Sequence, residues 1–122
     1  MEVARGDIWM ADLPKPVGSA PGFRRPVIVV QSNDANDAGL NTVIVVPLTT
    51  NLGWAGFPGN VLIPARTGGL AEDSAANVTQ VLAIDLKLLV EYLGRVPRKL
   101  MLQIDEGLRS ILDIECPPGT LQ

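Results

Sequence analysis

Short apolar runs rich in β-branched residues follow one another along most of the chain. Residues 27–31 and 43–50 contain nearly continuous apolar stretches, which are typical of buried strands rather than of helices. In residues 77–84, apolar and polar residues alternate at first, so the side chains of Val78 and Leu82 are expected to face the core. The pattern therefore predicts five strands, over residues 6–13, 27–31, 43–50, 61–64 and 77–84.

The pattern becomes helical after Pro97, a residue that suits the start of a helix. From Arg98 onward, apolar side chains recur at helical spacing and predict one buried stripe. Gly107 within this stretch costs about 1 kcal/mol relative to alanine, so we expect close packing there. Before it, Asp85 is expected to cap a short helical turn over residues 86–90. The stripe of the long helix consists of Leu100, Met101, Ile104, Leu108, Ile111 and Leu112.

These elements predict a mainly β fold with a smaller helical part. We expect a small, mostly antiparallel β-barrel or curled sheet that is closed by the C-terminal helix. The chain has no internal repeat and no dividing linker, so residues 1–114 are predicted to form a single domain. Residues 115–122 carry Pro-Pro-Gly and no periodicity, which predicts a flexible tail.

The first two connections differ in character. Residues 14–23 contain three prolines and are longer than most hairpin loops, and loops of this length are often functional. Residues 33–39 are rich in Asn and Asp, which predicts a turn. The spacing of a calcium-binding loop is missing there, so we do not expect a metal site.

Two further loops follow the third and fourth predicted strands. Residues 51–60 hold four Gly or Pro residues around Trp54 and Phe57. These aromatic rings could stack on bases or pack against the domain or a second copy, and packing is the slightly favoured interpretation. Residues 65–75, rich in glycine and small residues, predict another loop.

Composition narrows the possible chemistry. Ten basic and thirteen acidic residues give a net charge of −3, which argues against a protein that coats nucleic acids non-specifically but permits a small basic site. The absence of histidine excludes histidine acid–base catalysis, histidine-dependent nucleophiles and histidine metal sites. The single Cys116 cannot form an internal disulfide. Without a signal-peptide pattern or an apolar run near ~20 residues, we expect a cytoplasmic protein.

Candidate chemistry lies where two predicted strands meet. Arg24 and Arg25 precede one strand, and the next strand ends in Thr49 and Thr50. If these strands are antiparallel neighbours, Arg25 and Thr49 lie at the same edge of the sheet. A guanidinium beside a hydroxyl can bind a phosphate group, because the planar fork grips two oxygens while the hydroxyl donates to a third.

The chain resembles the MazF/PemK family of toxin endoribonucleases from bacterial toxin–antitoxin pairs. Residues 5–13 are similar to the opening strand of the family, and residues 24–32 to its central signature. Residues 45–49 match the strand that bears the family's threonine. Residues 74–80, followed by Asp85, are similar to its late strand and turn. Four such segments in the right order make the resemblance specific.

The resemblance implies an SH3-like small β-barrel (CcdB/MazF-like) with a C-terminal helix, forming a homodimer. It also implies a sequence-specific endoribonuclease, needing no metal or other cofactor, that cleaves single-stranded RNA to 2′,3′-cyclic phosphate and 5′-hydroxyl ends. A cognate antitoxin would inhibit it. The catalytic pair is carried over to Arg25 and Thr49. The implied RNA-binding residues are Ser19, Phe23, Arg24, Thr50 and Gln80.

Two departures and two alternatives qualify the resemblance. Ala20 stands where many members carry an acidic residue, and Leu82 where a basic residue is common, so the resemblance extends to the core pair but does not determine the RNA sequence preference or the cutting rate. One alternative is a non-enzymatic toxin similar to the CcdB gyrase poisons, which would not need the pair of Arg25 and Thr49. The other is an SH3-like binding module without catalysis, because fold does not determine activity.

Overall fold

The computed structural model describes residues 2–115 of the protein. Residues 116–122, which include Cys116 and nearly all of the predicted tail, lie outside the described residues. No helix within residues 2–115 is long and apolar enough to cross a membrane. The elements are β1 (Asp7–Leu13), β2 (Phe23–Val29), the helix α1 (Asn33–Asp37), β3 (Thr42–Thr49), the 3₁₀ helix η1 (Leu52–Gly56), β4 (Val61–Ile63), β5 (Ser74–Ala76), the 3₁₀ helix η2 (Val78–Gln80), β6 (Leu82–Asp85), the 3₁₀ helix η3 (Leu86–Leu88), β7 (Leu89–Arg95) and the helix α2 (Arg98–Leu112).

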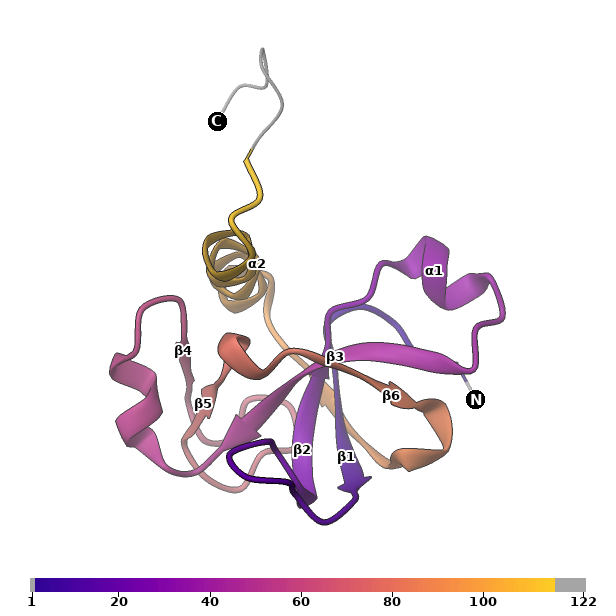
Figure 1. Ribbon diagram of the computed structural model, residues 1–122, viewed down its shortest axis with the longest axis horizontal. Helices are drawn as coiled ribbons and strands as arrows, with labels where there is room; N and C mark the ends of the chain where they lie inside the picture. Colours follow the sequence, from indigo (N-terminus) through magenta and orange to yellow (C-terminus); the bar gives the residue numbers. More distant parts are fainter. Residues whose placement is uncertain (1, 116–122) are drawn as a thin grey trace.

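The strands form one curled antiparallel sheet with β3 at its centre. The strand order is β4-β5-β3-β2-β1-β7, and β6 pairs with the first half of β3. Figure 1 shows β3 running from the α1 side of the molecule to β5, with α2 over the β4 end. Among residues 2–115, β4 and β7 end this path without pairing to each other, so the barrel stays half open. The fold is a mainly antiparallel half-barrel with a C-terminal helix, as predicted.

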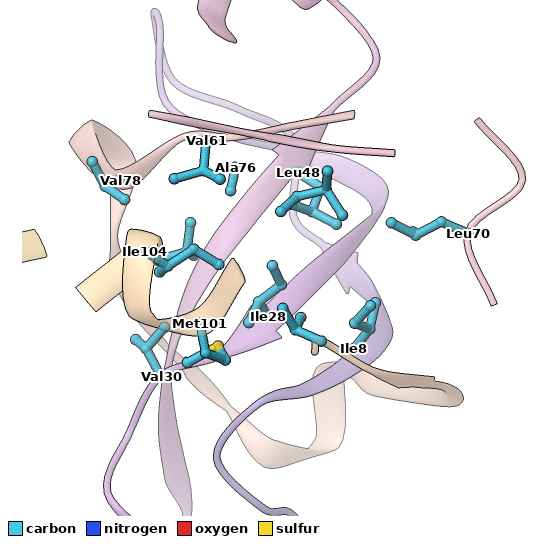
Figure 2. Packing of buried hydrophobic residues seen from close by; sticks show 13 residues of the cluster. Ile8, Ile28, Val30, Leu48, Val61, Leu70, Ala76, Val78, Met101 and Ile104 are labelled. Atoms are coloured by element: carbon cyan, nitrogen blue, oxygen red, sulfur yellow. The ribbon is translucent and has the colours of Figure 1, made fainter. Parts of the chain in front are cut away.

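Two hydrophobic clusters lie on opposite faces of the central strands, because successive side chains of a strand point to opposite sides. In β2, Ile28 belongs to the larger cluster while Val27 and Val29 belong to the smaller one. Met101 and Ile104 of α2 close the larger cluster, which Figure 2 shows around Ile28 and Leu48. Burial of each such side chain contributes about 1.5–3 kcal/mol. This packing makes the sheet a rigid support for the loops at its edges.

The C-terminal helix begins and packs as predicted. Pro97 is its N-cap and α2 starts at Arg98, while Asp113 ends it in the left-handed conformation. Gly107 is buried against the loop before β4, where an added Cβ would meet the carbonyl oxygen of Gly59 closer than real Cβ atoms come. The predicted close packing is confirmed. Two members of the predicted stripe stay exposed at the end of the helix, namely Ile111 and Leu112.

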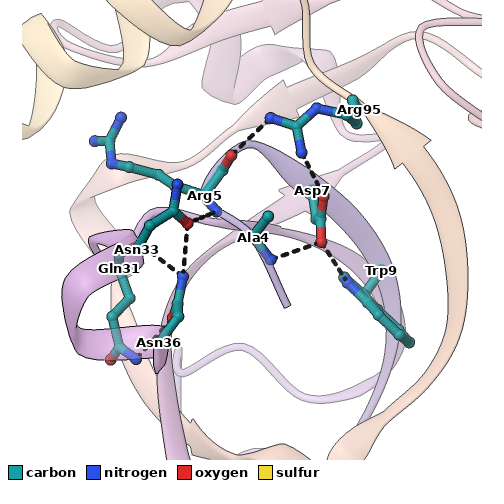
Figure 3. Close-up of polar contacts among 8 residues, drawn as sticks. All are labelled: Ala4, Arg5, Asp7, Trp9, Gln31, Asn33, Asn36 and Arg95. Atoms are coloured by element: carbon teal, nitrogen blue, oxygen red, sulfur yellow. Dashed lines mark hydrogen bonds and ion pairs between the residues drawn. The ribbon is translucent and has the colours of Figure 1, made fainter. Parts of the chain in front are cut away.

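Polar contacts tie the start of the chain to β7 and α2. The buried carboxylate of Asp7 accepts hydrogen bonds from the Ala4 amide at 2.8 Å and from Trp9 Nε1 at 3.3 Å, and pairs with Arg95 at 2.8 Å (Figure 3). Arg95 also donates to the carbonyl oxygen of Arg5 at 2.9 Å. The Arg5 guanidinium reaches Asp105 of α2. The N-terminal segment is therefore held to both β7 and α2.

Two predicted connections contain regular structure instead. Residues 33–39 were expected to form a turn, but they hold the short helix α1. The Ser32 hydroxyl accepts a hydrogen bond from the Ala35 amide at 3.2 Å and caps this helix, which explains why Asx-rich sequence becomes helical here. The predicted loop over residues 65–75 ends in β5, whose pairing with β3 and β4 depends on distant partners.

The predicted fifth strand, over residues 77–84, is wrong in its first half. Residues 78–80 form η2, and only β6 continues as a strand. The Asn60 side chain accepts a hydrogen bond from the Val78 amide at 2.9 Å, so this amide is not available to a strand partner. Val78 is nevertheless fully buried, and Leu82 packs against the smaller cluster.

The next segment is partly as expected. Asp85 caps the following 3₁₀ turn, its carboxylate accepting from the Lys87 amide at 2.9 Å. The turn was predicted over residues 86–90 but ends at Leu88, because β7 begins at Leu89 and pairs with β1. This pairing contains two register shifts, which interrupt the alternation that would have predicted a strand.

Candidate active site

The register of the central strands brings Arg25 and Thr49 to one cavity. The β2–β3 ladder ends at the pair of Val27 and Pro47. If the same register is continued by two residues, Arg25 comes to lie opposite Thr49. Beyond Val27 the β2–β3 ladder stops, while Thr49 pairs with Ala75 of β5 on the other edge of β3. Between the diverging strands lies a cavity of about 200 Å³. Its lining residues are Arg24, Arg25, Pro26, Leu48, Thr49, Thr50 and Ser74.

The Arg25 side chain is half buried and oriented by the loop that precedes it. Its Nε donates a hydrogen bond to the carbonyl oxygen of Gly22 at 2.9 Å. Within residues 2–115, the terminal nitrogens of Arg25 have no hydrogen-bond or ion-pair partner. The planar end of the side chain is thus preorganised and still able to bind two oxygens of an anion.

Thr49 contributes a hydroxyl whose orientation is also defined. Its Oγ1 accepts a hydrogen bond from the Asn51 amide at 3.1 Å. A threonine hydroxyl that accepts one bond keeps its proton to donate to another group. Thr50 is exposed at the rim of the same cavity. Arg25 and Thr49 therefore offer a cation and a hydroxyl donor on facing strands.

Two more predicted residues lie at the start of β2. Arg24 lines the cavity, is mostly exposed, and has Nη2 at 3.9 Å from Glu91 Oε1 on β7. A pair this long and this exposed contributes little to stability, so Arg24 is free to change partner. Phe23 begins the strand with its side chain 60% exposed. β2 starts earlier than the predicted residues 27–31, so both arginines belong to the strand itself.

Ser19 and Gln80 do not line the cavity but contact each other. Gln80 Nε2 donates a hydrogen bond to the backbone carbonyl oxygen of Ser19 at 2.6 Å. Gln80 ends η2, and Ser19 lies in the long loop between β1 and β2. This bond holds the loop that precedes β2 against η2.

Some residues at this edge had no individual signal in the sequence. Ser74 is buried in β5 and lines the cavity, with its hydroxyl donating to the Glu72 carbonyl oxygen at 3.2 Å. The buried Asn77 accepts from the Asn60 side-chain amide at 3.2 Å, and Asn60 also donates to the Trp54 carbonyl oxygen at 3.0 Å. The contact between Asn60 and Asn77 fixes the loop after β3 against η2. The two residues lie too far apart in the sequence for a local pattern to predict this contact.

The aromatic residues of that loop form a separate surface. The rings of Trp54 and Phe57 lie 6.1 Å apart and remain 37% and 46% exposed. The two rings contact each other and both residues are partly covered, so the interpretation that they pack against the domain or a second copy stays a prediction. They line an open hollow of about 660 Å³ that has no charged side chain among its lining residues. The hollow therefore lacks the groups needed for phosphate chemistry.

Comparison with known proteins decides the family. Residues 4–112 match the family described as PemK-like, MazF-like toxin of type II toxin-antitoxin system. The chain belongs to this family. Endoribonuclease MazF2 of Mycobacterium bovis is 44% identical to this toxin over 114 residues, covering 93% of the chain and all of the relative.

Solved structures of MazF proteins share the fold of this toxin. MazF from Deinococcus radiodurans superposes with a TM-score of 0.77 at 20% identity, covering 93% of this chain and 99% of that one. A mycobacterial endoribonuclease in complex with its cognate antitoxin gives a TM-score of 0.73 at 23% identity, covering 94% of this chain and 99% of that one. The predicted family and the predicted MazF-like fold are both confirmed.

Proposed function

We propose that this MazF-type toxin is an endoribonuclease that cleaves single-stranded RNA at the cavity between Arg25 and Thr49. The observation that supports the site is the half-buried Arg25 guanidinium, whose terminal nitrogens have no partner among residues 2–115, on the strand next to the one that bears the Thr49 hydroxyl. Membership of the family and the 44% identical endoribonuclease support the activity. The CcdB-like and binding-module alternatives would leave this pair without a role.

The reaction that suits these groups is internal transesterification. The 2′-oxygen of a ribose attacks the adjacent phosphorus and loses its proton, the bond to the 5′-oxygen breaks, and that oxygen takes a proton. The products are a 2′,3′-cyclic phosphate and a 5′-hydroxyl. Negative charge builds on the phosphorane oxygens, which the fork of Arg25 stabilises while Thr49 donates a hydrogen bond and keeps the phosphate in line. Arginine stays protonated in proteins, so Arg25 serves as an electrostatic clamp rather than as a base.

The remaining predicted RNA-binding residues surround this centre. Arg24 and Thr50 line the cavity and are placed to contact neighbouring phosphates or sugars. Ser19 and Gln80 act together, because their hydrogen bond sets the position of the loop that borders the site. Phe23 flanks the arginines. These residues contact only a few nucleotides of the RNA around the cavity, which accounts for cutting at short, specific sequences.

We assign the chain to a type II pair in which a cognate antitoxin inhibits it. An antitoxin segment with acidic side chains would neutralise Arg24 and Arg25 and cover the cavity. It would bind as an amphipathic helix, or as an added strand at β4 or β7, which end the sheet path within residues 2–115. The active protein is a homodimer, and residues 1–114 make up one toxin domain.

The reaction is tested with purified, antitoxin-free protein, a long single-stranded RNA and excess EDTA. We expect discrete fragments with 2′,3′-cyclic phosphate and 5′-hydroxyl ends, and no cleavage at a site whose attacking ribose carries a 2′-deoxy substitution. Fragments with 3′-hydroxyl ends, or cleavage that survives the 2′-deoxy substitution, would exclude this chemistry. Intact RNA from a folded protein would favour the CcdB-like or binding-module alternatives.

A further inference from the structure

Phe23 occupies a backbone position that favours glycine. Its φ is 62°, in the left-handed region that a bulky side chain avoids. The preceding turn is closely packed, since a Cβ on Gly22 would lie 2.7 Å from atoms of Pro16. The Phe23 amide then donates to the Pro14 carbonyl oxygen at 3.3 Å, and the residue pairs with Leu13 as the last pair of the β1–β2 ladder.

Burial does not compensate for this strain. The side chain of Phe23 is 60% exposed, and it belongs to neither hydrophobic cluster. Neither the backbone angle nor core packing therefore explains an aromatic residue at this position. Strained residues persist where the surrounding structure imposes them, and they concentrate at ligand-binding sites.

The neighbours of Phe23 indicate the ligand. The next two residues, Arg24 and Arg25, line the cavity assigned to the reacting phosphate. An exposed aromatic ring beside cationic side chains combines the two features that bind single-stranded nucleic acid, a stacking surface for a base and a positive site for the backbone. The ring and the guanidinium of Arg25 lie two residues apart at one end of β2.

We propose that Phe23 stacks on an unpaired nucleobase of the RNA strand whose phosphate lies at Arg25. This role rests on the proposed function and specifies how the substrate is held. Every base has a π-face, so the contact adds affinity without selecting the base. The strained backbone presents the ring toward solvent, where a splayed base can reach it.

The strain is tested without RNA by comparing glycine and alanine at two exposed phenylalanines. At Phe23, F23G should melt above F23A, by about 3–6 °C, because glycine tolerates the positive φ. At Phe57, where φ is −73°, the order should reverse and F57G should melt below F57A. The same order at both positions would overturn the claim that Phe23 is strained.

Stacking is tested with an RNA that the wild type cuts, made uncleavable by a 2′-O-methyl group on the attacking ribose. F23Y should bind it like the wild type, while F23L should bind about 5- to 150-fold more weakly. F23L keeps the strain and most of the apolar surface, so equal binding by F23L would overturn the stacking role alone. A wild type that neither cuts nor binds RNA would overturn both this proposal and the proposed function.

Discussion

Replacing Gly107 by alanine has two opposing effects, a gain in helix propensity and a clash where α2 closely approaches the loop before β4. Gly107 is buried in α2 and faces the carbonyl oxygen of Gly59. An added Cβ would lie closer than 3.0 Å to that oxygen, whereas ordinary contacts begin at 3.4 Å. The oxygen belongs to the backbone and cannot rotate away. The helix or the loop before β4 must therefore move.

The two effects differ in size. Alanine in a helix interior gains about 1 kcal/mol over glycine. Forcing a methyl group into a packed interface costs about 1–3 kcal/mol, and a backbone obstacle places Gly107 near the upper end. We expect a net destabilisation of about 2 kcal/mol, which for a domain of this size lowers the melting temperature by roughly 6–12 °C.

The free energy of unfolding is measured by urea titration followed through tryptophan fluorescence, at one protein concentration because association would shift the midpoint. The matched control is S110A, since Ser110 is exposed on the same helix and alanine there should change stability by at most about 0.5 kcal/mol in the favourable direction. If G107A proves as stable as the wild type, the close approach of Gly107 to Gly59 is refuted.

Three further substitutions test individual contacts. Arg25→Lys keeps the charge but loses the planar fork, so kcat/KM for RNA cleavage should fall by about 10²-fold, and near-wild-type rates would disprove the need for a guanidinium. Gln80→Met keeps the shape but cannot donate to Ser19, so amides of the loop before β2 should exchange hydrogen about fivefold faster or more by mass spectrometry; unchanged exchange would argue against that contact. Asp7→Asn removes the buried charge that pairs with Arg95 and should cost about 1–3 kcal/mol in urea unfolding, whereas a change near zero would show that the pair is dispensable.

Apolar runs and helical periodicity predicted the elements that contribute most side chains to the core. β1, β3 and β4 follow from their apolar runs, and α2 follows from its stripe and Pro97. β5 could not be found this way, because its small residues, Ser74–Ala76, are shaped by pairing with β3 and β4 rather than by local propensity.

The centre of the candidate site could be predicted for a physical reason, whereas its surroundings could not. Antiparallel pairing of two neighbouring strands is enough to bring Arg25 opposite Thr49. The bond between Ser19 and Gln80 joins residues 61 positions apart through two loops, so it depends on how the whole half-barrel closes. The positive φ of Phe23 and the close packing of Gly22 against Pro16 are likewise not indicated by any local pattern.

The most direct test of the central claim compares alanine variants inside and outside the cavity on the same RNA in EDTA. Arg25→Ala and Thr49→Ala should stay folded and lose at least about 10²-fold in cleavage rate, because each removes a group that stabilises the transition state. The controls are Arg98→Ala, at the exposed start of α2, and Thr42→Ala, at the opposite end of β3, and both should cut at the wild-type rate. Wild-type cleavage by a folded Arg25→Ala or Thr49→Ala protein would contradict the assignment of the active site.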